Sequence, residues 1–103
     1  MLADQYAGDS GTWMPFFGRL TSTTTLPAAL ARRVDTGIVP ISIPTTGTAR
    51  WQVVVGNPLD AVGSPEAATA VINRELERQI AASPADWLWT HDRWKTPRFG
   101  FLL

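Results

Sequence analysis

The sequence contains no cysteine and only one histidine, His91. The lack of cysteine excludes disulfide scaffolds, thiolate catalysis and cysteine-ligated zinc or iron–sulfur sites. The single histidine excludes a metal site built from several imidazoles. Positive charge is not in excess, because nine Lys and Arg balance nine Asp and Glu. A dedicated nucleic-acid-binding protein normally carries a strong basic surplus, so the composition argues against that class.

Long apolar runs are also missing. No stretch approaches the roughly 20 residues that a membrane-spanning helix needs, and Met1 to Gln5 lacks the basic and apolar regions of a secretory signal. On this ground alone we expect a cytosolic chain. A membrane surface is still open to it, because aromatic residues favour that interface and the chain has five Trp among 103 residues. With 45% hydrophobic residues, a chain of this length is one domain at most, or part of one.

The hydrophobic pattern predicts an α/β protein with two or three strands and two helices. The run from Gly37 to Ile43 is β-branched and continuous, which is typical of a buried strand. Ser64 and Pro65 are favourable residues for the N-cap and first position of a helix, and the polar run 21–25 is expected to cap the other helix. The expected elements are strands at 12–17, 37–43 and 50–55, a helix at 26–33, and a helix that begins after Ser64 and contains Ile80.

Gly8-Asp9-Ser10-Gly11 has the composition that surrounds the nucleophile in two serine-hydrolase families. In one of them the histidine and aspartate precede the serine, and here only seven residues precede Gly8. In the other, an Asp-x-x-His block supplies the partners, but Leu88 stands three residues before His91. Gly, Asp and Ser are also ordinary turn residues. We therefore interpret this segment as a turn, and a serine hydrolase is the least favoured function.

Two other segments carry candidate chemistry. Asp4 and Gln5 precede a glycine-containing turn, where a carboxylate and a carboxamide either cap the turn or orient a ligand or a catalytic base. The segment from Trp87 to Arg98 combines indoles with cationic side chains. It is either a packed aromatic layer with solvated charges or a site for a phosphorylated lipid headgroup, with Arg and Lys on phosphate and indoles at the interface.

Together these segments resemble the C-terminal half of the bacterial lipid A biosynthesis acyltransferases, the lauroyl- and myristoyl-transferring family. The resemblance runs from Leu2 to about Pro97 and is most specific in its last block. The matching blocks, in family order, are Asp4-Gln5 with Gly8, Gly11–Arg19 (Gly-Thr-Trp-Met-Pro-Phe-Phe-Gly-Arg), the Thr-rich run 21–25, residues 29–33 (Ala-Leu-Ala-Arg-Arg), Ile38–Ser42 (Ile-Val-Pro-Ile-Ser) and Trp87–Thr96 (Trp-Leu-Trp-Thr-His-Asp-Arg-Trp-Lys-Thr).

The resemblance implies the C-terminal part of a lysophospholipid-acyltransferase-like fold, with a partial mixed sheet and flanking helices. It also implies transfer of a fatty acyl group from an acyl-carrier-protein thioester to a hydroxyl of a lipid A-type glycolipid, with no bound cofactor and no metal. In the family, the general base is the histidine of a His-x-x-x-x-Asp/Glu motif upstream of the Asp-Gln block. Here His91 already matches the last block, and Thr96 stands where the motif acid would be.

We therefore expect residues 1–103 to be a single incomplete domain that lacks the N-terminal half with the catalytic motif and is inactive alone. The sequence also lacks the N-terminal membrane anchor of the family, which works at the cytoplasmic face of the bacterial inner membrane. No residue of the chain is assigned as the base, although Asp4 is a supporting candidate. Arg93 and Lys95 would face lipid phosphate or hold the C-terminal segment in place. The expected substrate-binding residues are Asp4, Gln5, Gly8, Thr23, Arg93 and Lys95. The alternative is a non-enzymatic module that binds lipid headgroups.

Overall fold

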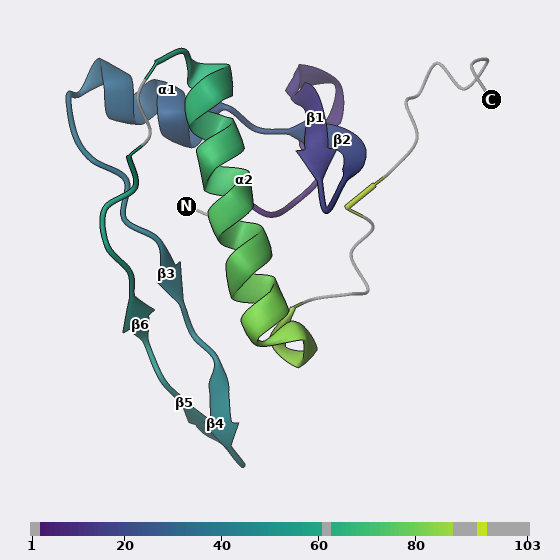
Figure 1. The fold of residues 1–103 in the computed structure, drawn as a ribbon, viewed down its shortest axis with the longest axis vertical. Coiled ribbons are helices and arrows are strands. Elements are labelled where there is room, and N and C mark those ends of the chain that lie inside the picture. Colours follow the sequence, from purple (N-terminus) through teal and green to yellow (C-terminus); the bar gives the residue numbers. More distant parts are fainter. Residues whose placement is uncertain (1–2, 61–62, 88–92, 95–103) are drawn as a thin grey trace.

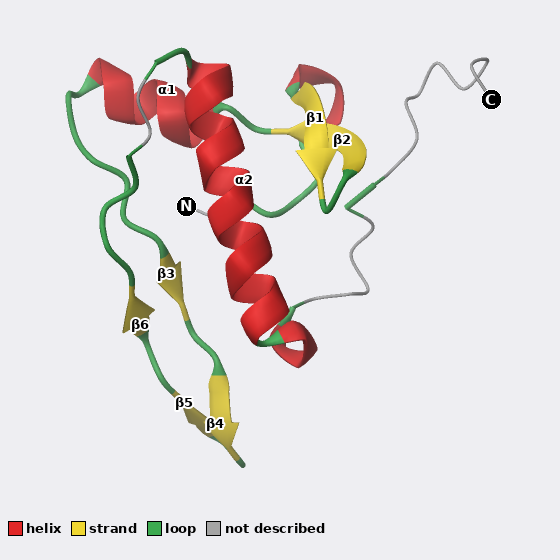
Figure 2. Ribbon diagram, in the orientation of Figure 1, coloured by secondary structure: helices red, strands yellow, loops and turns green. Residues whose placement is uncertain are grey.

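A computed structural model of the chain describes residues 3–60, 63–87 and 93–94. The mixed α/β class is confirmed, and the strands in these ranges form three two-stranded antiparallel pairs. Figures 1 and 2 show the shorter helix packed near one end of the longer helix, a short hairpin on one side of the longer helix and, on the other side, a long arm that runs past its far end. The elements are η1 (Gly8–Ser10), β1 (Thr12–Phe16), β2 (Arg19–Thr23), α1 (Leu26–Arg33), β3 (Ile41–Ser42), β4 (Thr45–Gly47), β5 (Arg50–Trp51), β6 (Val54–Val55), α2 (Pro65–Ala82) and η2 (Pro84–Asp86).

The first hairpin joins β1 to β2 through a two-residue turn at Phe17 and Gly18. Both residues have positive φ, 51° and 74°, as in the tight turns whose twist matches that of paired strands. The strand expected at 12–17 is therefore confirmed. The polar run 21–25 was expected to cap a helix, and this was wrong for its first three residues, which pair with β1. Their hydroxyl groups have buried partners, described below.

Helix α2 is the element that local sequence signals specify best. The Ser64 hydroxyl accepts a hydrogen bond from the Ala67 main-chain N–H at 3.1 Å, and Pro65 follows in the first turn. The same helix holds the first hairpin: its Glu77 carboxylate accepts from the Phe17 N–H at 2.7 Å. Helix α1 begins after Thr25, whose side chain makes no capping hydrogen bond.

This difference between the two caps leads to a prediction. Ser64→Ala leaves the N–H of Ala67 without its acceptor, so we expect the free energy of unfolding to fall by about 1 kcal/mol. Thr25→Ala is the matched control and should leave stability nearly unchanged, since its side chain caps nothing. Urea unfolding followed by circular dichroism measures both. Equal losses in the two variants would contradict the assignment of Ser64 as the cap.

Residues 38–59 form the long arm. β3 pairs with β6, and β4 pairs with β5 farther out (Figure 1). The expected strands at 37–43 and 50–55 are present only as these short pieces. The burial expected for residues 37–43 was wrong: Ile41 and Ile43 are each 57% exposed. The outer end is fastened to η2, because the Asp86 carboxylate accepts from the Thr45 N–H and hydroxyl at 3.0 and 2.5 Å.

The hydrophobic core among the described residues is small. It is centred on Ala28 of α1 with Ala68 and Ile72 of α2, and partly buried side chains surround it: Ala3, Ile38, Leu59 and Leu76. A second buried region lies in the first hairpin around Phe16, which is fully buried. Within the described residues, neither helix is both long and apolar enough to cross a membrane.

Candidate functional site

The loop before β1 is fastened along β2. The Ala7 N–H donates to the Ser22 carbonyl at 3.2 Å, and the Ser22 hydroxyl donates to the Gly8 carbonyl at 2.6 Å. The approach is so close that a Cβ at Gly11 would lie 2.0 Å from the Ser22 Oγ. These contacts fix the main chain that carries Asp4, Gln5 and Gly8.

Ser10 belongs to the turn and to no catalytic group among the described residues. It lies in the 3-10 turn η1, and its exposed hydroxyl donates to the Ala7 carbonyl at 3.2 Å. This geometry is that of an ordinary turn, in agreement with our interpretation of the Gly-Asp-Ser-Gly segment.

Asp4 is hydrogen-bonded to a residue from the C-terminal part of the sequence. Its Oδ2 accepts a hydrogen bond from the Trp87 indole N–H at 2.8 Å, across a sequence separation of 83 residues. Asp4 is partly buried, whereas its neighbour Gln5 is exposed. The carboxylate is thus restrained in orientation, and the neighbouring residue Gln5 is accessible to solvent.

Arg93 is completely buried against β2. Its Nη1 donates to the Thr21 Oγ1 at 2.9 Å and to the Ser22 carbonyl at 2.7 Å, and its Nη2 donates to the Thr23 Oγ1 at 3.0 Å. The Thr21 hydroxyl in turn donates to the Arg93 carbonyl. Strand β2 therefore supplies the hydroxyl and carbonyl oxygens that bind the Arg93 guanidinium group.

Burying the positive charge of Arg93 is energetically unfavourable. Burial lowers the pKa of the guanidinium from its ordinary value, and the negative charge of Asp4 acts in the opposite direction. The Nε has no hydrogen-bond partner among the described residues. Among the described residues, the hydrogen-bond partners of the Arg93 guanidinium are neutral, and the charge of Asp4 acts to compensate this cation.

An aromatic cluster covers the same region. The Phe16 ring lies 5.9 Å from Trp87 and 5.8 Å from Trp94, and these two indoles meet edge to face. The Trp94 indole N–H donates to the Phe16 carbonyl at 3.0 Å, and the Arg93 guanidinium lies 5.0 Å above the Phe16 ring. Trp87 thus connects Asp4 to the cluster that Arg93 supports. Of the two interpretations of the segment from Trp87 to Arg98, the packed aromatic layer is the one that describes Trp87 and Trp94.

The structure brings four of the predicted site residues into one region of the molecule. Asp4 and Gly8 lie in the loop along β2, and Thr23 and Arg93 lie in the buried network beneath it. For Arg93, the contacts are those of a residue that holds the C-terminal segment in place, one of the two roles that the sequence left open. The solvated charges of one of the two alternatives for the segment 87–98 do not describe Arg93, whose side chain is buried. The predictions for Lys95 and His91 fall outside the described residues.

Sequence reasoning missed two features of this region. It did not identify Trp87 as the partner of Asp4, and it did not identify the consecutive hydroxyl groups of β2 as acceptors for Arg93. The available signal was the coincidence of one arginine inside a tryptophan-rich segment with a Thr-Ser-Thr run, since a buried guanidinium requires several acceptors.

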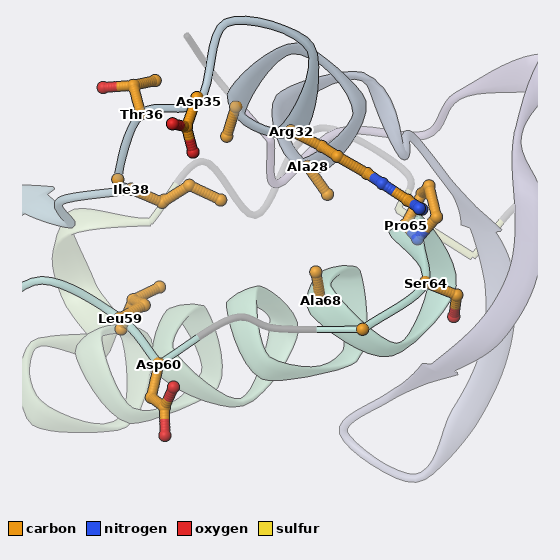
Figure 3. Close-up of a pocket in the computed structure, with 13 residues that line it drawn as sticks. Ala28, Arg32, Asp35, Thr36, Ile38, Leu59, Asp60, Ser64, Pro65 and Ala68 are labelled. Atoms are coloured by element: carbon orange, nitrogen blue, oxygen red, sulfur yellow. The ribbon is translucent and has the colours of Figure 1, made fainter.

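A separate open cleft of about 750 Å³ lies between α1 and the first turn of α2. Figure 3 shows the Arg32 side chain reaching from α1 toward Pro65, with Asp35 and Asp60 on other parts of the wall. None of the predicted site residues lines this cleft. The cleft mixes charges of both signs, from Arg32, Asp35 and Asp60.

Comparison with known proteins identifies the family. No curated protein matches the chain. The family model described as bacterial lipid A biosynthesis acyltransferase matches residues 1–96, which include the loop with Asp4, both strands of the first hairpin and the buried Arg93. The chain therefore belongs to the bacterial lipid A biosynthesis acyltransferase family.

Proposed function

We propose that this chain forms one wall of an acyltransferase site that moves a fatty acyl group from an acyl-carrier-protein thioester to a hydroxyl of a lipid A-type glycolipid. The observation that carries the proposal is the family match over residues 1–96. The restrained carboxylate of Asp4 beside the exposed Gln5 supports it. The reaction takes place at the cytoplasmic face of the bacterial inner membrane, where both substrates are accessible.

The reaction sets clear requirements. A general base removes the proton of the acceptor hydroxyl, the oxygen forms a bond to the thioester carbonyl carbon, and the carbon–sulfur bond breaks to release the carrier-protein thiol. Hydrogen-bond donors stabilise the tetrahedral oxyanion between these steps. No metal or organic cofactor enters this balance.

The described residues meet these requirements only in part. Asp4, Gln5 and Gly8 form the accessible side of the wall, and we assign them to substrate contact. Thr23 and Arg93 have buried side chains that hydrogen-bond to each other, so we assign them to support of the wall. Lys95 is proposed to meet a lipid phosphate.

The general base is proposed to come from an N-terminal half of the enzyme that carries the His-x-x-x-x-Asp/Glu motif. His91 is the only histidine of this chain, and Thr96 stands five residues after it in place of an acid. Residues 1–103 then act as a single incomplete domain, and the N-terminal half is their partner together with acyl-carrier protein and the glycolipid.

A transfer assay tests this proposal. The purified chain is mixed with acyl-carrier protein loaded with a fatty acid and with a lipid A precursor, and acylated product is measured. We expect a rate about 100- to 10,000-fold below that of a complete family enzyme, because a positioned base contributes that much. Product formed by the chain alone and lost in His91→Ala would contradict the missing base.

Adding a separately produced N-terminal half from a family enzyme should restore transfer. Asp4→Asn should then lower the restored rate, whereas Asp9→Asn is the matched control because Asp9 is exposed in the turn η1. Reversible binding of the precursor by a chain whose transfer is never restored would instead favour the non-enzymatic module that binds lipid headgroups.

A further inference from the structure

Trp87 links the loop before β1 to the segment that follows α2. Its indole N–H donates to the Asp4 Oδ2 at 2.8 Å, a usual length for a hydrogen bond to a charged acceptor. An indole N–H can only donate, and the oxygens of an ionised carboxylate can only accept. The contact therefore engages one identified oxygen of Asp4, and it does so with a donor that carries no charge.

The indole of Trp87 is held on several sides. Its ring centre lies 5.9 Å from those of Phe16 and Trp94, and it meets Trp94 edge to face. Phe16 is completely buried, so the indole packs against a rigid neighbour. The main-chain N–H of Trp87 donates to the Pro84 carbonyl at 3.4 Å, which connects the residue to the turn η2. The donor that faces Asp4 is therefore fixed in place before any ligand binds.

The second oxygen of the Asp4 carboxylate has a different environment. Among residues 3–60, 63–87 and 93–94, the hydrogen bond to the Asp4 side chain is made at Oδ2, and no donor reaches Oδ1. The guanidinium of Arg93 interacts with Asp4 through charge but directs its hydrogen bonds to β2. Asp4 is only partly buried, and Gln5 beside it is exposed. Oδ1 is therefore the oxygen with capacity to accept a donor from a ligand.

We infer that Trp87 is a positioning residue of the acyltransferase site: by holding Oδ2, it presents the Oδ1 of Asp4 to a hydroxyl group of the acceptor sugar. The inference rests on the proposed function, in which Asp4 contacts the glycolipid. The hydroxyl bound at Oδ1 is not the one that attacks the thioester, because the single proton of the attacking hydroxyl passes to the general base. Asp4 thus orients the acceptor, and Trp87 sets the direction of that contact.

An NMR measurement on the full chain tests the contact without enzymatic turnover. The chain is isotopically labelled at its five tryptophans, and the indole resonance of Trp87 is the one absent from Trp87→Phe. We expect Asp4→Ala to move the proton of that resonance upfield, because its hydrogen bond to a carboxylate is lost. Asp9→Ala is the matched control, since Asp9 is exposed in η1, and should leave the resonance in place. A Trp87 resonance that Asp4→Ala does not move would overturn the inference.

Kinetics of the enzyme restored with the N-terminal half test the role of the contact. Trp87→Phe keeps an aromatic ring in the cluster and removes the donor to Asp4. We expect the KM for the glycolipid to rise about fivefold, as for one weakened hydrogen bond, and the KM for the acyl-carrier-protein thioester to stay unchanged. Trp94→Phe is the matched control: it removes an indole N–H from the same cluster whose acceptor is the Phe16 carbonyl, and both KM values should stay near those of the wild type.

A double variant shows whether Trp87 acts through Asp4. In the Asp4→Ala background, Trp87→Phe should raise the KM for the glycolipid no further. A further rise, equal rises in Trp87→Phe and Trp94→Phe, or a lower kcat with both KM values unchanged would overturn the inference. A wild-type chain whose transfer the N-terminal half does not restore would instead contradict the proposed function, and the role of Oδ1 with it, whereas the NMR result for the contact would stand.

Discussion

Phe16→Ala is expected to lower the free energy of unfolding by about 3–5 kcal/mol, the usual cost of removing a large buried aromatic side chain. Phe16 is completely buried, and its ring contacts both Trp87 and Trp94. It also lies under the Arg93 guanidinium. Native proteins have a total stability of about 5–15 kcal/mol, so this loss is a large fraction of the free energy that keeps a chain folded.

Phe17→Ala is the control for this result. The adjacent ring is 44% exposed, so its removal leaves no closed cavity. Urea unfolding followed by tryptophan fluorescence compares the two variants and reports on the cluster directly, because Trp87 and Trp94 are part of it. Similar losses of stability in both would show that the first hairpin is not the second core of the chain.

The sequence predicted best what depends on neighbouring residues alone. Helix α2 begins where Ser64 and Pro65 indicate, because capping and backbone preference act within one turn. The strand at 12–17 was found for the same reason: Gly18 closes it with a tight turn. In each case the stabilising contact lies within a few residues of the signal.

The arm shows the limit of hydrophobicity as a signal for burial. Gly37 to Ile43 has the composition of a buried strand, yet Ile41 and Ile43 are exposed. An apolar pattern indicates that a surface is to be buried, but it does not indicate which part of the protein or which partner buries it.

The candidate site was predicted in its residues but not in its connections. Asp4 was chosen from the sequence, but its partner Trp87 lies 83 residues away. The run at Thr21 to Thr23 suggested a helix cap because Thr and Ser favour caps. The tertiary structure overrode that preference by placing a guanidinium that needs those hydroxyl groups as acceptors.

Arg93→Met is the prediction that tests this connection. The variant keeps much of the side-chain volume and leaves the Thr21 and Thr23 hydroxyl oxygens without the donor that Arg93 supplies. The Ser22 carbonyl loses one of its two donors and keeps the Ala7 N–H. Each buried acceptor left unpaired costs about 1–3 kcal/mol. Part of this cost is offset because a charge is no longer buried. We expect a net loss of about 2–4 kcal/mol in the free energy of unfolding.

The conservative variant and a surface arginine make this expectation specific. Arg93→Lys keeps the charge but loses the planar fork that reaches several acceptors at once, so it should recover only part of the loss. Arg78→Met removes an exposed arginine that pairs with Glu75 at 2.6 Å on the surface of α2, and its urea midpoint should stay near that of the wild type, because exposed ion pairs contribute little. A wild-type midpoint for Arg93→Met would show that β2 does not depend on the guanidinium. The C-terminal segment would then need another anchor, and the support that we assign to Arg93 beneath Asp4 would be wrong.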